Sequence, residues 1–393
     1  MLIYQSFIVY TILTVLMCYC AYRSQGSAKT ARLLGWIPIL LFTLVFGLRY
    51  GVGIDYNNYW DIYDYTEDYT LSDLWEYERF EYGFSWILYL CHHFDEPVYI
   101  FFSIIAFLQI YFLYKAFKDE GDILIFIYLT LIFSGIAMLS YMNIMRQIIA
   151  ACIFLFSLRY IRDNQPIRYW LCCLLALTFH KSAILLFPLY FIWIHNKSLL
   201  NRPLIEFGMV FFSLILMYVT DWLGILHRFD NLIALLGYDV YMDEADTMMN
   251  GGGRAIGLFD LIEFAIYSMI ILNSRQMKEY FKSDIFNILY DIFIVAVCLG
   301  YIFKGSMLLG RLIVYFTNTQ YIVVAYALSY LYHTYKQNNT QFFKYLFIVL
   351  FVVMQYSRFT YYCEQNTGAY VSYFQTDLHT LKDNLREETL EKY

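Results

Sequence analysis

The chain has 393 residues, of which 60% are hydrophobic and only 15% are charged, and its formal net charge is -6. Soluble domains average about 25% charged residues, so a chain this apolar is not an ordinary soluble protein. No stripe of basic residues is present, which excludes nucleic acid as a partner. The eight cysteines lie mostly in apolar runs without metal-ligand spacing, so we interpret them as small buried hydrophobes.

Predicted membrane spans follow one another from one end of the chain to the other. A helix of about 20 apolar residues crosses the hydrocarbon core of a bilayer. The candidate spans are about 3–22, 33–48, 97–117, 123–140, 147–161, 169–179, 182–194, 204–220, 258–273, 285–303, 312–332 and 342–357. No Pro/Ser-rich linker or long repeat divides the chain. We therefore expect an all-α polytopic membrane protein with about 11–13 transmembrane or re-entrant helices in a single domain, residues 1–393.

The loops between these spans alternate in their content of lysine and arginine, and the basic side of a membrane protein faces the cytoplasm. One set of loops holds fifteen basic residues, namely Arg23, Lys29, Arg32, Lys115, Lys118, Arg159, Arg162, Arg168, Lys197, Arg202, Arg275, Lys278, Lys282, Lys336 and Lys344. The intervening loops hold eight, namely Arg49, Arg79, Arg146, Lys181, Arg228, Arg254, Lys304 and Arg311. The amino terminus, two long loops (about 49–96 and 221–257) and the carboxyl-terminal tail (about 358–393) are then predicted to lie outside the cytoplasm.

The two long outer loops are acidic and rich in Tyr and Trp. Aromatic residues anchor proteins at the membrane interface, and aromatic faces beside carboxylates also bind sugars, whose ring faces stack on π surfaces while their hydroxyls need acceptors. The density of rings in the first loop favours carbohydrate, with Tyr56, Tyr59 and Trp60 as candidate contacts. In the second loop, Gly251-Gly252-Gly253-Arg254 predicts a hinge, and Arg254 is a further candidate for saccharide binding.

Residues 169–194 break the pattern of simple spans. They are apolar except for His180, Lys181 and Ser182 in the middle, and both flanks are basic. The chain must therefore enter the membrane and return, and each arm of about 11–13 residues extends only about 16–20 Å as a helix. We predict a pair of short, broken or re-entrant helices that place His180 near the outer interface, an arrangement that often marks a site.

The few cations on the predicted outer side stand near tight turns. Arg49 ends one span in the segment Gly47–Tyr56, Arg146 lies between two spans, and Arg311 begins another. An arginine at a membrane edge often only reaches for the headgroups. Because the outer side is otherwise poor in cations and the guanidinium fork suits a diphosphate, Arg49, Arg146 and Arg311 are candidates for diphosphate binding.

Two side chains are candidates for a general base. The imidazole of His180 can accept a proton near neutral pH, although a structural hydrogen bond between helices is an equally good explanation. Asp55 is the other candidate, and it can equally well form the turn after Gly53. Ionisable residues inside predicted spans are functional candidates as well, namely Asp260, Glu263 and Asp291. No nucleotide-binding glycine loop or zinc motif is present, so we expect no cofactor. Because arginines can replace a divalent cation, we also expect no metal requirement.

Three segments together resemble the EpsG-like branch of the Wzy-type bacterial polysaccharide polymerases. They are Gly47–Tyr59 (GLRYGVGIDYNNY), Tyr141–Ala150 (YMNIMRQIIA) and Phe179–Phe187 (FHKSAILLF), which is followed by Pro188. Each motif is short, but their order, spacing and membrane context agree over residues of about 40 to 330.

The resemblance implies a glycosyltransferase of the bacterial cytoplasmic membrane that joins oligosaccharide repeat units carried on a polyprenyl diphosphate, at the outer face. Arg49, Arg146 and Arg311 would hold the diphosphate and stabilise its charge as it leaves. His180 or Asp55 would accept the proton of the attacking hydroxyl. The implied partners are the lipid-linked oligosaccharide and membrane lipid, with a chain-length regulator and a flippase as candidate protein partners.

Three other functions remain open from the sequence. A flippase for the same lipid-linked sugars would need a cavity open to both sides and an internal repeat, and no repeat is evident. A membrane O-acyltransferase would also use an intramembrane histidine, but it would meet its acyl donor from the cytoplasm. A transporter or channel would explain buried acids but not the long aromatic outer loops.

Overall fold

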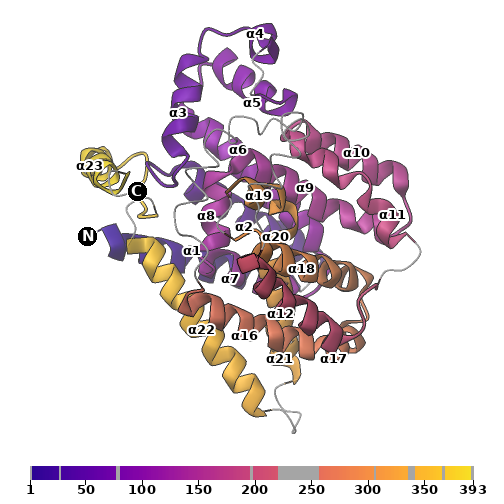
Figure 1. The fold of residues 1–393 in the computed structure, drawn as a ribbon. Coiled ribbons are helices and arrows are strands. Elements are labelled where there is room, and N and C mark those ends of the chain that lie inside the picture. The colour runs from indigo at the N-terminus through magenta and orange to yellow at the C-terminus, as the bar shows by residue number, and fades with distance from the viewer. Residues whose placement is uncertain are drawn as a thin grey trace. The chain divides into compact units, whose positions relative to one another are not determined.

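The computed structural model describes residues 2–25, 28–76, 80–194, 198–219, 256–304, 307–334, 341–364 and 368–390. Regular secondary structure in these residues is helical, apart from one isolated antiparallel bridge between Arg49 and Ser372 (Figure 1). Four described helices are long and apolar enough to cross a membrane: α1 (Leu2–Ser24), α6 (Val98–Phe117), α18 (Asp284–Ile302) and residues Lys344–Cys363 of α22 (Gln341–Glu364). The predicted class, an all-α polytopic membrane protein, is confirmed.

The helices form two compact units. The first comprises Met1–Phe156, Thr178–His180 and Gln355–Tyr393, and the second comprises Ser157–Leu177 and Lys181–Met354. Helix α9 (Met145–Arg162) and helix α22 each contribute residues to both units.

In the first unit, α1 packs against α2 (Ala28–Gly47) and α7 (Ile123–Phe133), and α2 packs against α6. These helices are apolar around most of their circumference, as expected for segments that meet protein on one side and lipid on the other. The predicted span 123–140 is broken in the structure. Helix α8 (Ile136–Asn143) turns away from α7 by 77°, and Gly135 between them has a φ of +67°, a conformation that glycine adopts without strain.

The segment predicted to form the first outer loop contains three helices, α3 (Tyr56–Tyr65), α4 (Leu71–Glu76) and α5 (Tyr82–His93). Helix α3 buries Tyr56, Tyr59 and Tyr63, which share one face at helical spacing. The Tyr56 ring stacks on Phe102 of α6 with centroids 5.0 Å apart. This stacking packs the start of α3 against α6.

In the second unit, the predicted broken pair is present as α10 (Pro166–Leu177), followed by the 3-10 helix η1 (Lys181–Leu186) and α11 (Leu189–Trp193). The two arms are held together because the hydroxyl of Tyr169 donates to the carbonyl of Leu186 at 2.7 Å. The prediction of two short arms is thus confirmed. Neither arm reaches the length of a full span.

Helix α18 occupies the centre of the second unit. It contacts α12 (Pro203–Val219), α17 (Ser274–Phe281), α20 (Val314–Thr317) and α21 (Gln320–Thr334), while α16 (Leu258–Leu272) packs on α12. The predicted span 312–332 is divided, because α19 (Met307–Leu312) and α20 precede α21 as separate short helices.

The acidic residues predicted inside spans all have partners. Asp291 is 2% exposed and accepts hydrogen bonds from Trp193 Nε1 at 3.0 Å and from the main-chain N–H of Leu199 at 2.8 Å. Asp260 pairs with Lys304, and Glu263 accepts from the hydroxyl of Tyr267. These contacts are sufficient to explain the three acids structurally, since a buried carboxylate requires such donors.

Candidate functional site

The candidate site is built where the end of α2 meets the turn between α8 and α9. Arg49 lies two residues after α2, and its Nη2 donates to the carbonyl of Met142 at 3.1 Å and contacts the Met145 sulfur at 3.0 Å. Its Nε donates to the carbonyl of Val52 at 3.2 Å, and Nη1 donates to that of Phe46. The first two motifs of the sequence analysis are therefore joined through one guanidinium.

Arg49 is only 1% exposed. Its guanidinium carbon lies 4.7 Å from the ring centroid of Phe102, and burial lowers the pKa of Arg49 to about 10, which leaves it protonated at neutral pH. A buried cation is stable only when its donors are satisfied, and main-chain carbonyls fulfil that role here. The predicted role of Arg49 in gripping a diphosphate requires a different conformation, and in this structure Arg49 fixes the turn.

Glycines allow the turn after α2 to approach α8 closely. Gly53 has a φ of +105°, and a Cβ at this position would lie 2.5 Å from Asn143 Oδ1. The same Asn143 oxygen accepts a hydrogen bond from the main-chain N–H of Ile54 at 2.8 Å. Only glycine combines this backbone conformation with this clearance.

Gln109 of α6 supports the other side of this turn, and the sequence analysis did not identify it. Its Nε2 donates to the carbonyl of Tyr141 at 3.1 Å and to that of Met145 at 3.2 Å. It is 1% exposed. A polar residue inside an otherwise apolar span was the available signal, because such a side chain needs a partner that the helix itself does not supply.

Arg146 is the cation of the site that remains accessible. It is the second residue of α9, its side chain is 22% exposed, and its Nη1 lies 2.7 Å from Glu81 Oε2. The guanidinium carbon also lies 5.1 Å from the ring centroid of Phe84. The carboxylate of Glu81 therefore occupies a position beside a cation, which favours an anion.

The third motif reaches the same unit through its first residues. The carbonyl of Thr178 accepts a hydrogen bond from the main-chain N–H of Gly83 at 2.7 Å, and Gly83 stands two residues after Glu81. His180 follows Thr178 within this unit and is half-buried. The structure thus brings the start of the third motif to the α5 end that carries the partners of Arg146.

Asp55 and the predicted sugar-binding aromatics lie at the start of α3. Asp55 occupies the N-cap position without forming a side-chain cap and is half-buried. Tyr56 and Tyr59 are 2% and 7% exposed, so their faces are used in packing and are not available for stacking on a sugar in this conformation. Trp60 is half-buried and keeps part of its ring accessible.

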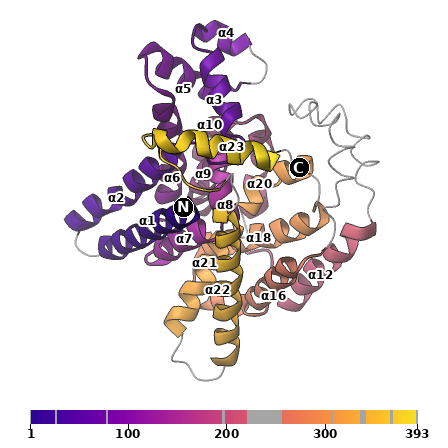
Figure 2. The ribbon, with the colours of Figure 1, turned by 90° about the vertical axis from the view of Figure 1, so that its left-hand side faces the viewer.

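The carboxyl-terminal segment lies across the Arg49 turn. The main-chain N–H of Tyr50 donates to the carbonyl of Val371 at 2.8 Å, and the Tyr50 ring stacks on that of His379 with centroids 3.5 Å apart. The Tyr50 hydroxyl donates to Asp383 Oδ2 at 3.0 Å. Helix α23 (His379–Leu390) therefore lies beside this turn and beside the amino-terminal end of α1 (Figure 2).

The two remaining predicted site residues are not among the described residues of the first unit. Arg311 belongs to the second unit, in α19, and Arg254 lies outside the described residues. Within the described part of the chain, no group of three or more His, Cys, Asp or Glu side chains is arranged to hold a metal ion.

The profile of the EpsG family matches residues 32–374 of the chain. The chain belongs to the EpsG family. No curated protein and no solved structure matches it. The match includes all three motifs and thus confirms the resemblance predicted from them. The EpsG-family chain is accordingly a multi-pass membrane protein of a family associated with exopolysaccharide biosynthesis. Helix α23 lies beyond the matched residues.

Proposed function

We propose that the chain is a polymerase that joins oligosaccharide repeat units, carried on a polyprenyl diphosphate, into a surface polysaccharide at the outer face of the bacterial cytoplasmic membrane. The observation that carries this proposal is the Arg146–Glu81 pair at the amino-terminal end of α9, in the unit that also contains Asp55 and His180. A cation at a helix amino terminus creates a favourable position for a phosphate anion.

The proposed reaction transfers a glycosyl group. A hydroxyl oxygen of the incoming unit attacks the anomeric carbon of the growing chain, and the new C–O bond forms while the bond from that carbon to the diphosphate oxygen breaks. The leaving diphosphate retains the electron pair of the broken bond. The hydroxyl proton passes to His180 or Asp55 and then to solvent.

Arg146 is proposed to stabilise the charge that develops on the leaving diphosphate. Glu81 holds the guanidinium in place before the substrate binds, and a diphosphate oxygen replaces Glu81 on binding. A donor placed where charge develops contributes more to the transition state than to the ground state. Trp60 is proposed to contact saccharide, while Arg49 is proposed to position the turn. Arg311 and Arg254 remain candidate contacts to the diphosphate and the saccharide.

The test is reconstitution of the purified full-length chain in nanodiscs with a polyprenyl-diphosphate repeat unit as the sole substrate. We expect products that differ by whole repeat units on a gel, without added nucleotide sugar. Arg146→Gln should lower the rate by about a hundredfold or more, as loss of one charge-stabilising donor typically does. The matched control is Arg162→Gln, which removes an exposed arginine paired with Asp163 and should leave the rate unchanged.

A flippase or other transporter of the lipid-linked oligosaccharide is the alternative. Correctly folded protein that forms no polymer but accelerates movement of the labelled lipid across liposome membranes would favour that alternative and reject the polymerase. Equal rates for Arg146→Gln and Arg162→Gln would remove the proposed role of Arg146 while leaving polymerase activity itself in place.

A further inference from the structure

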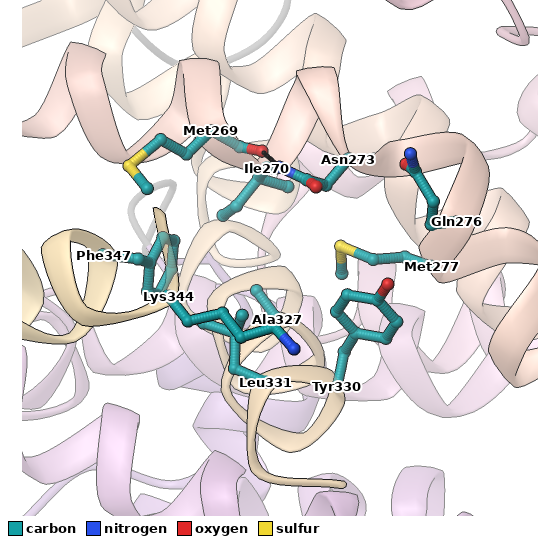
Figure 3. Close-up of a pocket in the computed structure, with 10 residues that line it drawn as sticks. All are labelled: Met269, Ile270, Asn273, Gln276, Met277, Ala327, Tyr330, Leu331, Lys344 and Phe347. Atoms are coloured by element: carbon teal, nitrogen blue, oxygen red, sulfur yellow. Dashed lines mark hydrogen bonds between the residues drawn. The ribbon is translucent and has the colours of Figure 1, made fainter. Parts of the chain in front are cut away.

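The second unit contains a cavity of about 80 Å³ among α16, α17, α21 and α22 (Figure 3). Pockets that enclose drug-sized ligands have volumes of roughly 300–1,000 Å³, so this cavity is too small for an oligosaccharide repeat unit. It is partly open to the outside. It can hold one small group or the end of a longer molecule.

The lining of the cavity is amphiphilic. Met269, Met277 and Phe347 form apolar wall, and the ammonium of Lys344, the amide of Gln276 and the hydroxyl of Tyr330 supply polar groups (Figure 3). Gln276 is exposed, whereas Phe347 is buried. A ligand with both a polar and an apolar part matches such a lining better than a purely polar solute does.

Lys344 gives the cavity its charge. Of the ten lining residues, it is the one with a charged side chain, and it is only 6% exposed. Its Nζ donates to the carbonyl of Thr334, the last residue of α21, where the negative end of the helix dipole favours a cation. The positive charge of this buried ammonium attracts an anion that enters the cavity.

The cavity also lies on the side of the membrane predicted to be cytoplasmic. Its wall includes α17, and the segment from α17 to α18 contains Arg275, Lys278 and Lys282. Basic residues concentrate on the cytoplasmic side, where pockets between membrane helices bind anionic lipid headgroups. We propose that this cavity binds the phosphate of an anionic membrane lipid from the cytoplasmic leaflet, with Lys344 facing the phosphate and the methionine wall facing the apolar part.

The test uses the purified full-length chain in neutral detergent, with thermal unfolding followed by tryptophan fluorescence. Phosphatidylglycerol in mixed micelles should raise the unfolding temperature by several degrees, and phosphatidylcholine should not. Lys344→Gln should abolish this rise, and Lys344→Arg should keep most of it. Arg275→Gln is the matched control, because its side chain is 80% exposed on α17, and it should respond as the wild-type chain does.

A rise of equal size with phosphatidylcholine, or a full rise in Lys344→Gln, overturns the proposal. A rise produced by inorganic phosphate alone, without lipid, assigns the cavity to a soluble anion and also overturns it. If Lys344→Gln does not fold, Ala327→Leu decides the question, because it fills the cavity without changing its charge. A folded Ala327→Leu protein that no longer responds to phosphatidylglycerol supports the proposal, and one that responds fully rejects it.

Discussion

Arg49 donates a hydrogen bond from Nη2 to the main-chain carbonyl of Met142 at 3.1 Å, across 93 positions of the chain. Through this contact, the buried guanidinium of the Gly47–Tyr59 motif binds the Tyr141–Ala150 motif, which is distant in the sequence. Four acceptors surround the Arg49 guanidinium, so its loss removes several hydrogen bonds at once. Arginine suits this position because its planar fork can donate to several acceptors together.

Arg49→Gln should therefore reduce stability more than it reduces chemistry. Leaving buried carbonyls without donors costs about 1–3 kcal/mol each, so we expect a lower unfolding temperature in detergent and less protein in the membrane. Arg49→Lys should restore only part of the stability. Arg162→Gln serves as the control for loss of an exposed arginine. A normal unfolding temperature combined with loss of polymer formation would instead assign Arg49 to the diphosphate.

Gly53→Ala should disrupt the contact between the Gly47–Tyr59 motif and the Tyr141–Ala150 motif. The φ of +105° is strained for alanine, and the new Cβ would lie 2.5 Å from Asn143 Oδ1, which accepts from Ile54. Gly121→Ala is the matched control, since Gly121 has a φ of +66° and no atom within 4 Å of the added Cβ. In that control, the free energy of unfolding should decrease by only about 1–2 kcal/mol. We expect Gly53→Ala to lower the unfolding temperature clearly more, and equal losses would show that Asn143 simply moves aside.

Lys382 attaches the carboxyl-terminal segment to the same turn. It is fully buried, its Nζ donates to the carbonyl of Ala369 at 2.5 Å, and its side chain lies against Gly51. Lys382→Ala should release the segment, so that amide hydrogens of the Tyr50–Gly51 turn exchange faster with deuterium. Lys118→Ala, which removes a partly exposed lysine paired with Asp119, should not change that exchange. Equal exchange in both variants would show that α23 does not stabilise the turn.

The sequence predicted those features that depend on local length and composition. The short arms on either side of His180 follow from their basic flanks, and the structure contains them as α10 and η1–α11. The break of the span 123–140 could not be predicted in this way. Gly135 is a single glycine in an apolar run, and this position requires glycine because its φ is +67° and because an added Cβ would lie 2.4 Å from the Tyr362 ring.

The burial of the candidate site residues also could not be predicted from the sequence. The pattern around Arg49 indicated a turn and a cation, but whether that cation faces a ligand or a carbonyl depends on Met142 and Phe102, which come from other helices. Likewise, Tyr50 pairs with Asp383 across 333 positions. Such contacts leave no periodic signal, because they depend on tertiary packing rather than on local order.

We expect His92 to make the loop that contains α3 and α5 sensitive to acid. Burial lowers the pKa of His92, and the carboxylates of Glu67 and Asp64 oppose this only in part. Its Nε2 lies 3.2 Å from the Thr66 hydroxyl. The folded protein thus binds a proton at the His92 imidazole more weakly than the unfolded chain does. The folded state is therefore most stable above the usual histidine pKa of about 6.5, where His92 is neutral. This stability is lost as the pH falls toward the lowered pKa of the folded state.

We therefore expect the unfolding temperature to fall between pH 7 and pH 5, and His92→Gln to reduce that dependence. The neighbouring His93 is exposed and stacks on Tyr89. It provides the control, because His93→Gln should keep the wild-type pH dependence. The explanation through His92 fails if His93→Gln flattens the profile and His92→Gln does not.

The choice between His180 and Asp55 as general base can be made from the pH dependence of polymer formation. Imidazoles titrate near about 6.5 and aspartates near about 3.9 in model peptides, and a base must be unprotonated to act. With His180 as the base, the rate should fall as the pH is lowered from 7.5 to 5.5, and His180→Gln should lower it at least a hundredfold and remove the pH dependence. His93→Gln is the matched control.

With Asp55 as the base, the rate should instead be level over the same range, and Asp55→Asn should abolish most of the activity. Asp61→Asn controls for the loss of an exposed carboxylate on the same helix. Each variant must unfold at the wild-type temperature for the comparison to count, since Asp55 also begins α3. If both His180→Gln and Asp55→Asn retain more than a tenth of the wild-type rate, neither residue is the base, and solvent or the substrate itself must accept the proton.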